Sequence, residues 1–458
     1  MCAAASGRSV WERRRLAALV AGGLLVAPCL ARAQYVPDYF PAGVPGYDQQ
    51  LGVTVVTRVQ PLYVEPEVRV GSFLLKPTID ESTGYNSNVL GLSGGAGSWF
   101  LETKPSLQIH SDWSRNSLGA SISADNTRYI HTPNQSATNW QAAIGGDYTI
   151  GRSELTLGYS HLELNERPTD LGAPPSSTPI PYTVDDLRSD YTFDLGRLKI
   201  TPNLDFSQWR FGSTTSAFAN VPKDQGFRDR DVIQGGGAFR YELSGKTSLL
   251  MVLQGANSQF VHPEPLLQPS LSQPPPLSST SGTALVGIDY QYDGLWRYQL
   301  LVGGEVRSFA ASQFATRVAP IAQGTVIWTP TGLTTVTASV LRTLQDPTEE
   351  GTSGYTYTRA QARVDHEYLR DVLLDGEVGI QNAAYQTGAT QTEYAGRGGI
   401  TWLLNRNLHL SLSYQYTKRI GAPSVVSAVG TVPVCNNCAV HLIMLQLHAD
   451  LALVHEGG

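Results

Sequence analysis

The chain has 458 residues, of which only 16% are charged, with 33 basic and 39 acidic side chains. The acidic excess argues against a nucleic-acid partner, and no stretch marks a boundary between separately folded units, so one large domain is the simplest organisation. Plentiful Gly (45) and Tyr (21) favour strands and turns over helices.

Residues 1–33 have the layout of a secretory signal peptide. Three arginines at 13–15 precede an apolar run at 16–30, and the small-residue triplet 31–33 precedes Gln34. The apolar run contains Pro28 and is too short to span a bilayer as a helix. Cleavage before Gln34 would remove five Arg and one Glu, leaving 28 basic and 38 acidic side chains. A lipoprotein attached through Cys29 is the alternative, but Pro28 fits a lipobox poorly.

The rest of the chain shows apolar and polar residues alternating with a period of two. In residues 98–111, Trp99, Leu101 and Ile109 share one face, while Glu102 and Lys104 share the other. The same alternation recurs at 140–150, 408–417 and 441–453. No run of eighteen apolar residues follows residue 34, which excludes a helical membrane span.

The length and spacing of these segments favour a membrane barrel. The alternating segments have about eleven to fifteen residues, whereas strands of soluble proteins average five or six. Short turns fall near 112–115, 151, 196, 244–245, 294, 331–332, 370 and 405–406. Longer polar segments lie near 86–97, 130–138, 167–182, 210–229, 261–282, 310–315, 346–354, 386–392 and 419–438. This rhythm predicts an even number of strands, about eighteen (16–18), with both termini on the short-turn side.

The predicted fold is therefore all-β: a transmembrane antiparallel up-and-down barrel at 69–458, with short periplasmic turns and long extracellular loops. Residues 34–68 show little alternation, and we expect them to form a periplasmic or plug-like segment. Aromatic residues near strand ends predict two membrane-interface girdles: Trp209, Phe260, Phe309, Tyr357 and Tyr416 on the long-loop side, and Trp296, Trp328, Tyr368 and Trp402 on the short-turn side. A soluble propeller or sandwich would explain the alternation but not the strand length.

Charged side chains on the polar face of several strands are candidates for a functional lumen. Strand parity places nine of them there: Arg297, Glu305, Arg307, Arg359, Arg363, Asp365, Glu367, Asp375 and Glu377. They could create a transverse field that orients polar solutes in a water-filled pore. Alternatively, they could only cross-link the barrel interior. No catalytic, phosphate-binding or zinc motif occurs, so we expect no enzyme activity, no cofactor and no metal.

The two cysteines that would remain after signal cleavage, Cys435 and Cys438, are separated by two asparagines in a polar segment. An oxidising compartment favours a local disulfide between them. Free thiols and a metal site remain alternatives, although no second Cys or His pair stands nearby at zinc-like spacing.

Residues 68–88 carry a short motif that resembles the start of the outer-membrane β-barrel porin type 2 family of proteobacteria. The matching residues, at and before the top of the first strand, are Gly71, Phe73, Pro77, Tyr85 and Asn88. The resemblance implies a porin, and some relatives are associated with exopolysaccharide biosynthesis and export. Many such barrels end in an aromatic residue used in assembly, whereas this chain ends in a polar tail after Leu453.

These features predict an outer-membrane barrel that passes or binds small hydrophilic or saccharide-like solutes through a charged lumen. An accessory role in exopolysaccharide biosynthesis or export is the first alternative, and a structural or adhesive surface barrel is the second. The expected partners are outer-membrane lipid and lipopolysaccharide, the barrel-assembly machinery, and small solutes or polysaccharide.

Overall fold

The computed structural model describes residues 44–47, 54–55, 63, 66–92, 94–174, 176–215, 222–261, 277–292, 295–348, 353–386, 388–421 and 437–452. Within these ranges no helix is both long and apolar enough to cross a membrane. The predicted signal peptide at 1–33 lies outside the described residues.

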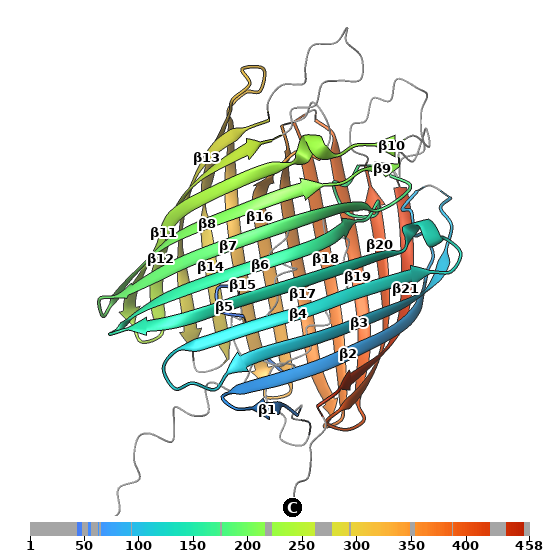
Figure 1. Ribbon diagram of the computed structural model, residues 1–458, viewed down its shortest axis with the longest axis horizontal. Helices are drawn as coiled ribbons and strands as arrows, with labels where there is room; N and C mark the ends of the chain where they lie inside the picture. The colour runs from blue at the N-terminus through green and yellow to red at the C-terminus, as the bar shows by residue number, and fades with distance from the viewer. Residues whose placement is uncertain are drawn as a thin grey trace, which may run out of the picture.

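Eighteen antiparallel strands close into one barrel, as the sequence predicts. Each strand pairs with its neighbour along the chain, and the last strand pairs with the first. Figure 1 shows the tilted front wall in blue and green against the rear wall in orange. The strands are β2 (Phe73–Asn86), β3 (Ser98–Ser111), β4 (Ser117–Tyr129), β5 (Ala137–Ile150), β6 (Ser153–Glu166), β7 (Ile180–Asp194), β8 (Leu198–Phe211), β11 (Arg230–Ser244), β12 (Thr247–Phe260), β13 (Ser279–Tyr292), β14 (Trp296–Phe309), β15 (Arg317–Thr331), β16 (Thr334–Gln345), β17 (Tyr355–Leu369), β18 (Val372–Tyr385), β19 (Thr390–Leu403), β20 (Leu408–Ile420) and β21 (Asn437–Asp450).

The period-two pattern of the sequence becomes an outer apolar face and an inner polar face. In β3, Trp99 and Leu101 are 49% and 53% exposed on the outside, whereas Phe100 and Glu102 between them are 5% and 6% exposed. Because successive side chains of a strand point to opposite faces, one residue in two meets lipid. A strand of this kind therefore satisfies its backbone through its neighbours while presenting an apolar surface to the membrane.

The connections alternate in length as predicted. From the strand bounds, the eight connections on one side of the barrel have two to five residues, and the nine on the other have four to eighteen. Gly151, in the two-residue turn between β5 and β6, has a φ of 64°. Tight hairpins need such left-handed residues because the turn must follow the twist of its strands.

A few short elements complete the described chain. They are β1 (Val68–Val70), the paired β9 (Thr214–Thr215) and β10 (Pro222–Lys223), and the 3-10 turns η3 (Pro133–Gln135) and η4 (Gly226–Arg228). β1 forms a small hairpin with β2 through Leu75, while β21 pairs with β2 only from Thr78 onward. Pro77 stands between these two pairings, where a residue without a backbone N–H costs the ladder least.

The prediction of an aromatic girdle is right on the short-turn side and largely wrong on the long-loop side. Trp296, Trp328, Tyr368 and Trp402 are 38–64% exposed on the outer face. Tyr357, by contrast, is 1% exposed within an inner cluster, and Trp209 lies under the guanidinium of Arg230. Phe260 and Phe309 also have the strand parity of the inner face. Of the residues predicted for the loop-side girdle, only Tyr416 has outward parity. The other four face the lumen, whose long-loop end is packed with side chains.

The seam between β2 and β21 is held by a polar cluster as well as by the ladder. Asp80 Oδ1 lies 2.8 Å from His448 Nδ1 and accepts a hydrogen bond of 2.8 Å from Gln446 Nε2. Gln446 and His448 are each 6% exposed, so removing the Asp80 carboxylate would deprive two buried polar side chains of a partner.

We expect Asp80→Ala to destabilise the barrel by about 1–3 kcal/mol, the usual cost of stranding buried polar groups. The urea midpoint of the shift between folded and unfolded gel mobility measures this. Asp190→Ala, on the lumen face of β7 and away from the seam, is the control. Equal midpoints for the two variants would contradict a role of Asp80 in closing the barrel.

Candidate functional site in the lumen

A cavity of about 390 Å³ lies inside the barrel against β11 to β16, near the ends of these strands that carry the long loops. Its volume falls within the range of small-molecule sites. Half of its lining residues are neutral polar side chains that can donate and accept hydrogen bonds. These neutral polar residues are Gln234, Gln254, Ser258, Ser279, Ser281, Thr283, Gln323, Thr343 and Gln345.

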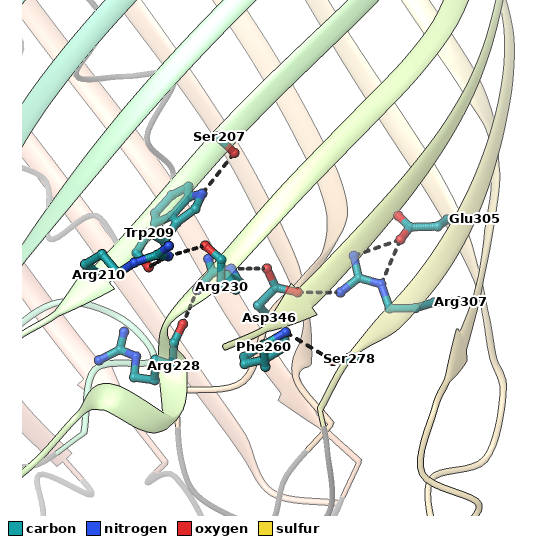
Figure 2. Close-up of polar contacts among 10 residues, drawn as sticks. All are labelled: Ser207, Trp209, Arg210, Arg228, Arg230, Phe260, Ser278, Glu305, Arg307 and Asp346. Atoms are coloured by element: carbon teal, nitrogen blue, oxygen red, sulfur yellow. Dashed lines mark hydrogen bonds and ion pairs between the residues drawn. The ribbon is translucent and has the colours of Figure 1, made fainter. Parts of the chain in front are cut away.

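A network of two arginines and two carboxylates borders this cavity (Figure 2). Asp346, just after β16, lies 3.0 Å from Arg230 Nε and 2.8 Å from Arg307 Nη1 through its two oxygens. Arg307 also bonds Glu305 at 2.9 Å through Nη2, and Arg230 lies 4.4 Å above the ring of Trp209. We call these four charged residues the Asp346 network.

The Asp346 network carries no net formal charge, since two guanidinium groups face two carboxylates. Burial raises the pKa of Asp346, but the positive charges of Arg230 and Arg307 outweigh burial and hold that pKa below its ordinary value. Asp346 therefore stays ionised and keeps both arginines paired. The cavity beside it offers hydrogen bonds without offering an uncompensated charge.

A second ion pair, between Arg228 and Glu166, is buried more deeply at the long-loop end of the lumen. Arg228, in η4, donates to both carboxylate oxygens of Glu166 at 2.7 and 3.2 Å, and the two side chains are 0% and 2% exposed. The guanidinium also lies 4.0 Å above the ring of Phe211. Two-point contacts of this kind fix orientation as well as charge, so the pair joins the end of β6 to the loop before β11.

Residues 167–174, which we call the outer loop, run from β6 to the far wall of the barrel. Leu171 is 0% exposed and packs in a cluster with Tyr355, Tyr357 and Ala383 of β17 and β18. The backbone N–H of Gly172 donates to Gln391 Oε1 on β19 at 3.0 Å. Since β6 and β18 lie on opposite sides of the strand order, the outer loop crosses the long-loop end of the lumen.

Asp170 in the outer loop is itself buried. Its Oδ2 accepts a hydrogen bond of 2.8 Å from the backbone N–H of Arg167. Burial raises the pKa of Asp170 to about 7, against the opposing effect of Arg167. We therefore expect docking of the outer loop to depend on pH between about 3.9, the ordinary pKa of an aspartate, and about 7.

The structure places seven of the nine predicted lumen charges in two separate groups. Glu305 and Arg307 belong to the Asp346 network. Arg363 bonds Asp365 at 2.8 Å and lies 3.8 Å from Glu377, while Asp375 pairs at 3.0 Å with a residue not predicted, Arg397. Glu367 is 9% exposed next to this second group on β17. Arg297 and Arg359 have inward parity on β14 and β17.

The family model described as "Putative beta-barrel porin 2" matches residues 60–430 of the chain. The chain belongs to this family. Together with the closed barrel, membership makes it a porin-like outer-membrane barrel, and it indicates a channel rather than an enzyme. In the part of the chain that the structure describes, no group of three or more His, Cys, Asp or Glu side chains could hold a metal ion.

Several solved structures are similar to this porin-family chain at 9–12% identity. The FrpB iron transporter (F5-1 variant) of Neisseria meningitidis is 12% identical with a TM-score of 0.45, over 78% of this chain and 65% of FrpB. OccK2 (OpdF) of Pseudomonas aeruginosa is 11% identical with a TM-score of 0.44, over 82% and 98%. OccAB3 of Acinetobacter baumannii is 9% identical with a TM-score of 0.45, over 83% and 100%. No curated relative matches the chain.

The residues of the porin-family motif have local structural roles. Gly71, with a φ of 61°, turns the chain between β1 and β2, and Phe73 begins β2. The ring of Tyr85 packs against that of Trp99, with centroids 5.4 Å apart and planes tilted by 58°. Asn88 closes the first long loop, since its Nδ2 donates to Leu92 O at 2.8 Å. These residues shape the first hairpin and contribute no group to the cavity.

Cys438 is buried and disulfide-bonded. Its predicted partner, Cys435, lies outside the described residues, so the pairing of the two stays a prediction.

The sequence alone did not single out the residues that organise the site: Glu166, Arg228, Arg230 and Asp346. Asp346 falls in a long loop, and nothing in its local pattern shows which strands it meets. One signal was available, because residues 227–231 combine Phe227 with alternating Arg and Asp across the start of β11. Such a dense mixed-charge run at a strand start is unusual in a chain with only 16% charged residues.

Proposed function

We propose that this porin-family barrel binds small uncharged polyhydroxylated solutes, saccharides above all, in the cavity beside the Asp346 network and passes them through the lumen. The observation that carries the proposal is the chemistry of the lining. Neutral amides and hydroxyls can pair with sugar hydroxyls as donors and as acceptors. A charged solute would lose hydration there and find the nearby charges already paired.

Calorimetric titration of the refolded protein with glucose and maltose tests the proposal. Gln323→Leu removes two hydrogen-bonding groups from the lining, and we expect it to weaken sugar binding by about fivefold, the effect of roughly one lost hydrogen bond. Gln361→Leu is the matched control, since Gln361 is on β17 outside the cavity lining. An absence of sugar binding by folded protein, or an equal loss in both variants, would contradict the proposal.

The charge balance of the network makes a separate prediction for ligand choice. Asp346→Asn removes the carboxylate shared by Arg230 and Arg307 and gives the network a net positive charge. We expect binding of glucuronate to gain about tenfold over its uncharged amide, because a guanidinium becomes available to the ligand carboxylate. Calorimetry with the two ligands measures the ratio, and an unchanged ratio would show that the network does not set charge preference.

The accessory role in polysaccharide export and the adhesive role stay predictions of the sequence. Neither gains support from a contact among the described residues, whereas the lined cavity supports solute binding directly.

A further inference from the structure

Part of the N-terminal segment lies inside the barrel. Residues 44–47 form a turn against the inner faces of β5, β6 and β7, where Val44 and Tyr47 are 1% and 3% exposed and pack on Ala143. The Tyr47 hydroxyl donates to the backbone oxygen of Asp186 at 2.8 Å. The guanidinium of Arg188 lies 4.7 Å from the centroid of the same ring. The turn is therefore held by apolar, hydrogen-bonding and cation–π contacts together.

The wall beneath this turn is shaped to receive it. Gly145 of β5 and Gly158 of β6 face each other directly across the two strands. A Cβ atom on Gly145 would lie 2.0 Å from the backbone oxygen of Pro45, and one on Gly158 would lie 2.7 Å from Tyr47 Cε2. Any other residue at either position would occupy the space of the turn. The two glycines thus form a seat, which we call the glycine seat.

A second contact ties the same segment to the opposite wall. The backbone N–H of Val55 donates to Thr335 Oγ1 at 2.9 Å, and these residues are 2% and 0% exposed. Thr335 belongs to β16, and eight strands separate β16 from β5 in either direction around the barrel. These two attachment points, on opposite walls and only eight residues apart in sequence, place residues 44–47 and 54–55 inside the lumen.

We propose that residues 44–47 and 54–55 belong to an internal plug, and that release of residues 44–47 from the glycine seat opens the channel. The barrel is then an autoinhibited channel. A solute bound in the cavity near the long loops completes its passage only when the segment leaves the seat. Docked and released states of the segment form the two-state element that such control needs.

The variant Gly158→Leu tests docking of the plug without disturbing the barrel wall. The three atoms nearest to a Cβ at this position all belong to Pro45 and Tyr47, so the substitution collides with the segment and not with the wall. We expect full-length Gly158→Leu protein in planar bilayers to show an open probability about tenfold above wild type, as a loss of about 1.4 kcal/mol of docking free energy gives. Tyr47→Ala, which removes the docked ring and leaves the wall unchanged, should act in the same direction.

Gly379→Leu is the matched control. Gly379 has inward parity on β18, and a Cβ there meets its neighbours at an ordinary 3.6 Å, so this variant should conduct like wild type. Equal open probabilities for wild type, Gly158→Leu and Tyr47→Ala, with folding shown by heat-modifiable gel mobility, would overturn the plug. So would a rise in Gly379→Leu equal to that in Gly158→Leu. Sugar calorimetry of the same proteins tests the proposed function separately, because the cavity lining is unchanged.

Discussion

Replacing Glu166 with Gln should free the loops at the outer end of the barrel from their anchor, at a cost of about 3–5 kcal/mol. The guanidinium of Arg228 is 0% exposed and bonds both oxygens of Glu166. In Glu166→Gln the positive charge stays buried but loses its countercharge, which is far more costly than losing an exposed pair. The rate of trypsin cleavage after Lys223, in the loop before β11, measures the loosening in the folded barrel.

Two further variants separate charge burial from general damage. Glu242→Gln breaks the exposed pair with Lys199, whose atoms lie 3.7 Å apart, and should cost less than about 1 kcal/mol. The double variant Arg228→Met/Glu166→Leu removes both buried charges and should recover most of the protection. Cleavage of Glu166→Gln at the rate of Glu242→Gln would show that the buried pair does not hold the outer end.

The barrel itself follows from local sequence pattern. Residues 98–111, picked out by alternation alone, coincide with β3, because a membrane strand is constrained on one face by lipid and on the other by the lumen. The number of strands follows from counting the connections, since each further pair of strands adds one short and one long connection. The strand alternation and the alternation of connection lengths can each be recognised within about thirty consecutive residues, without knowledge of any long-range contact.

The packed outer end could not be predicted in the same way. Tyr357 was expected at the membrane interface but is buried against Leu171 of the outer loop, which starts from the opposite wall. Arg230 meets Asp346 more than a hundred residues further along the chain, only because the barrel closes. Strand parity does indicate the face of a residue, but whether that face meets water or an inward-folded loop depends on loop conformation, which has no periodic pattern.

Lowering the pH from about 7 toward 4 should tighten the outer loop. Burial raises the pKa of Asp170 to about 7 in the docked loop, and Arg167, Glu166 and Arg419 modify it by their charges. In an undocked, hydrated loop the pKa returns to about 3.9. Between these values the docked state binds a proton that the undocked state does not, so docking gains up to about 1.4 kcal/mol for each unit by which pH falls. The full gain is present below about 4, and it is lost as pH rises to about 7.

Hydrogen exchange of residues 167–174, corrected for the intrinsic pH dependence of exchange, measures this docking. Wild-type protection should increase about tenfold per pH unit on acidification within that window. Asp170→Asn, which stays neutral at every pH, should show constant protection, because it lacks the titrating group. Parallel pH profiles for wild type and Asp170→Asn would assign the dependence to another group. If the profiles differ as expected, we expect entry to the cavity from the long-loop side to slow in acid, independently of the proposed N-terminal plug.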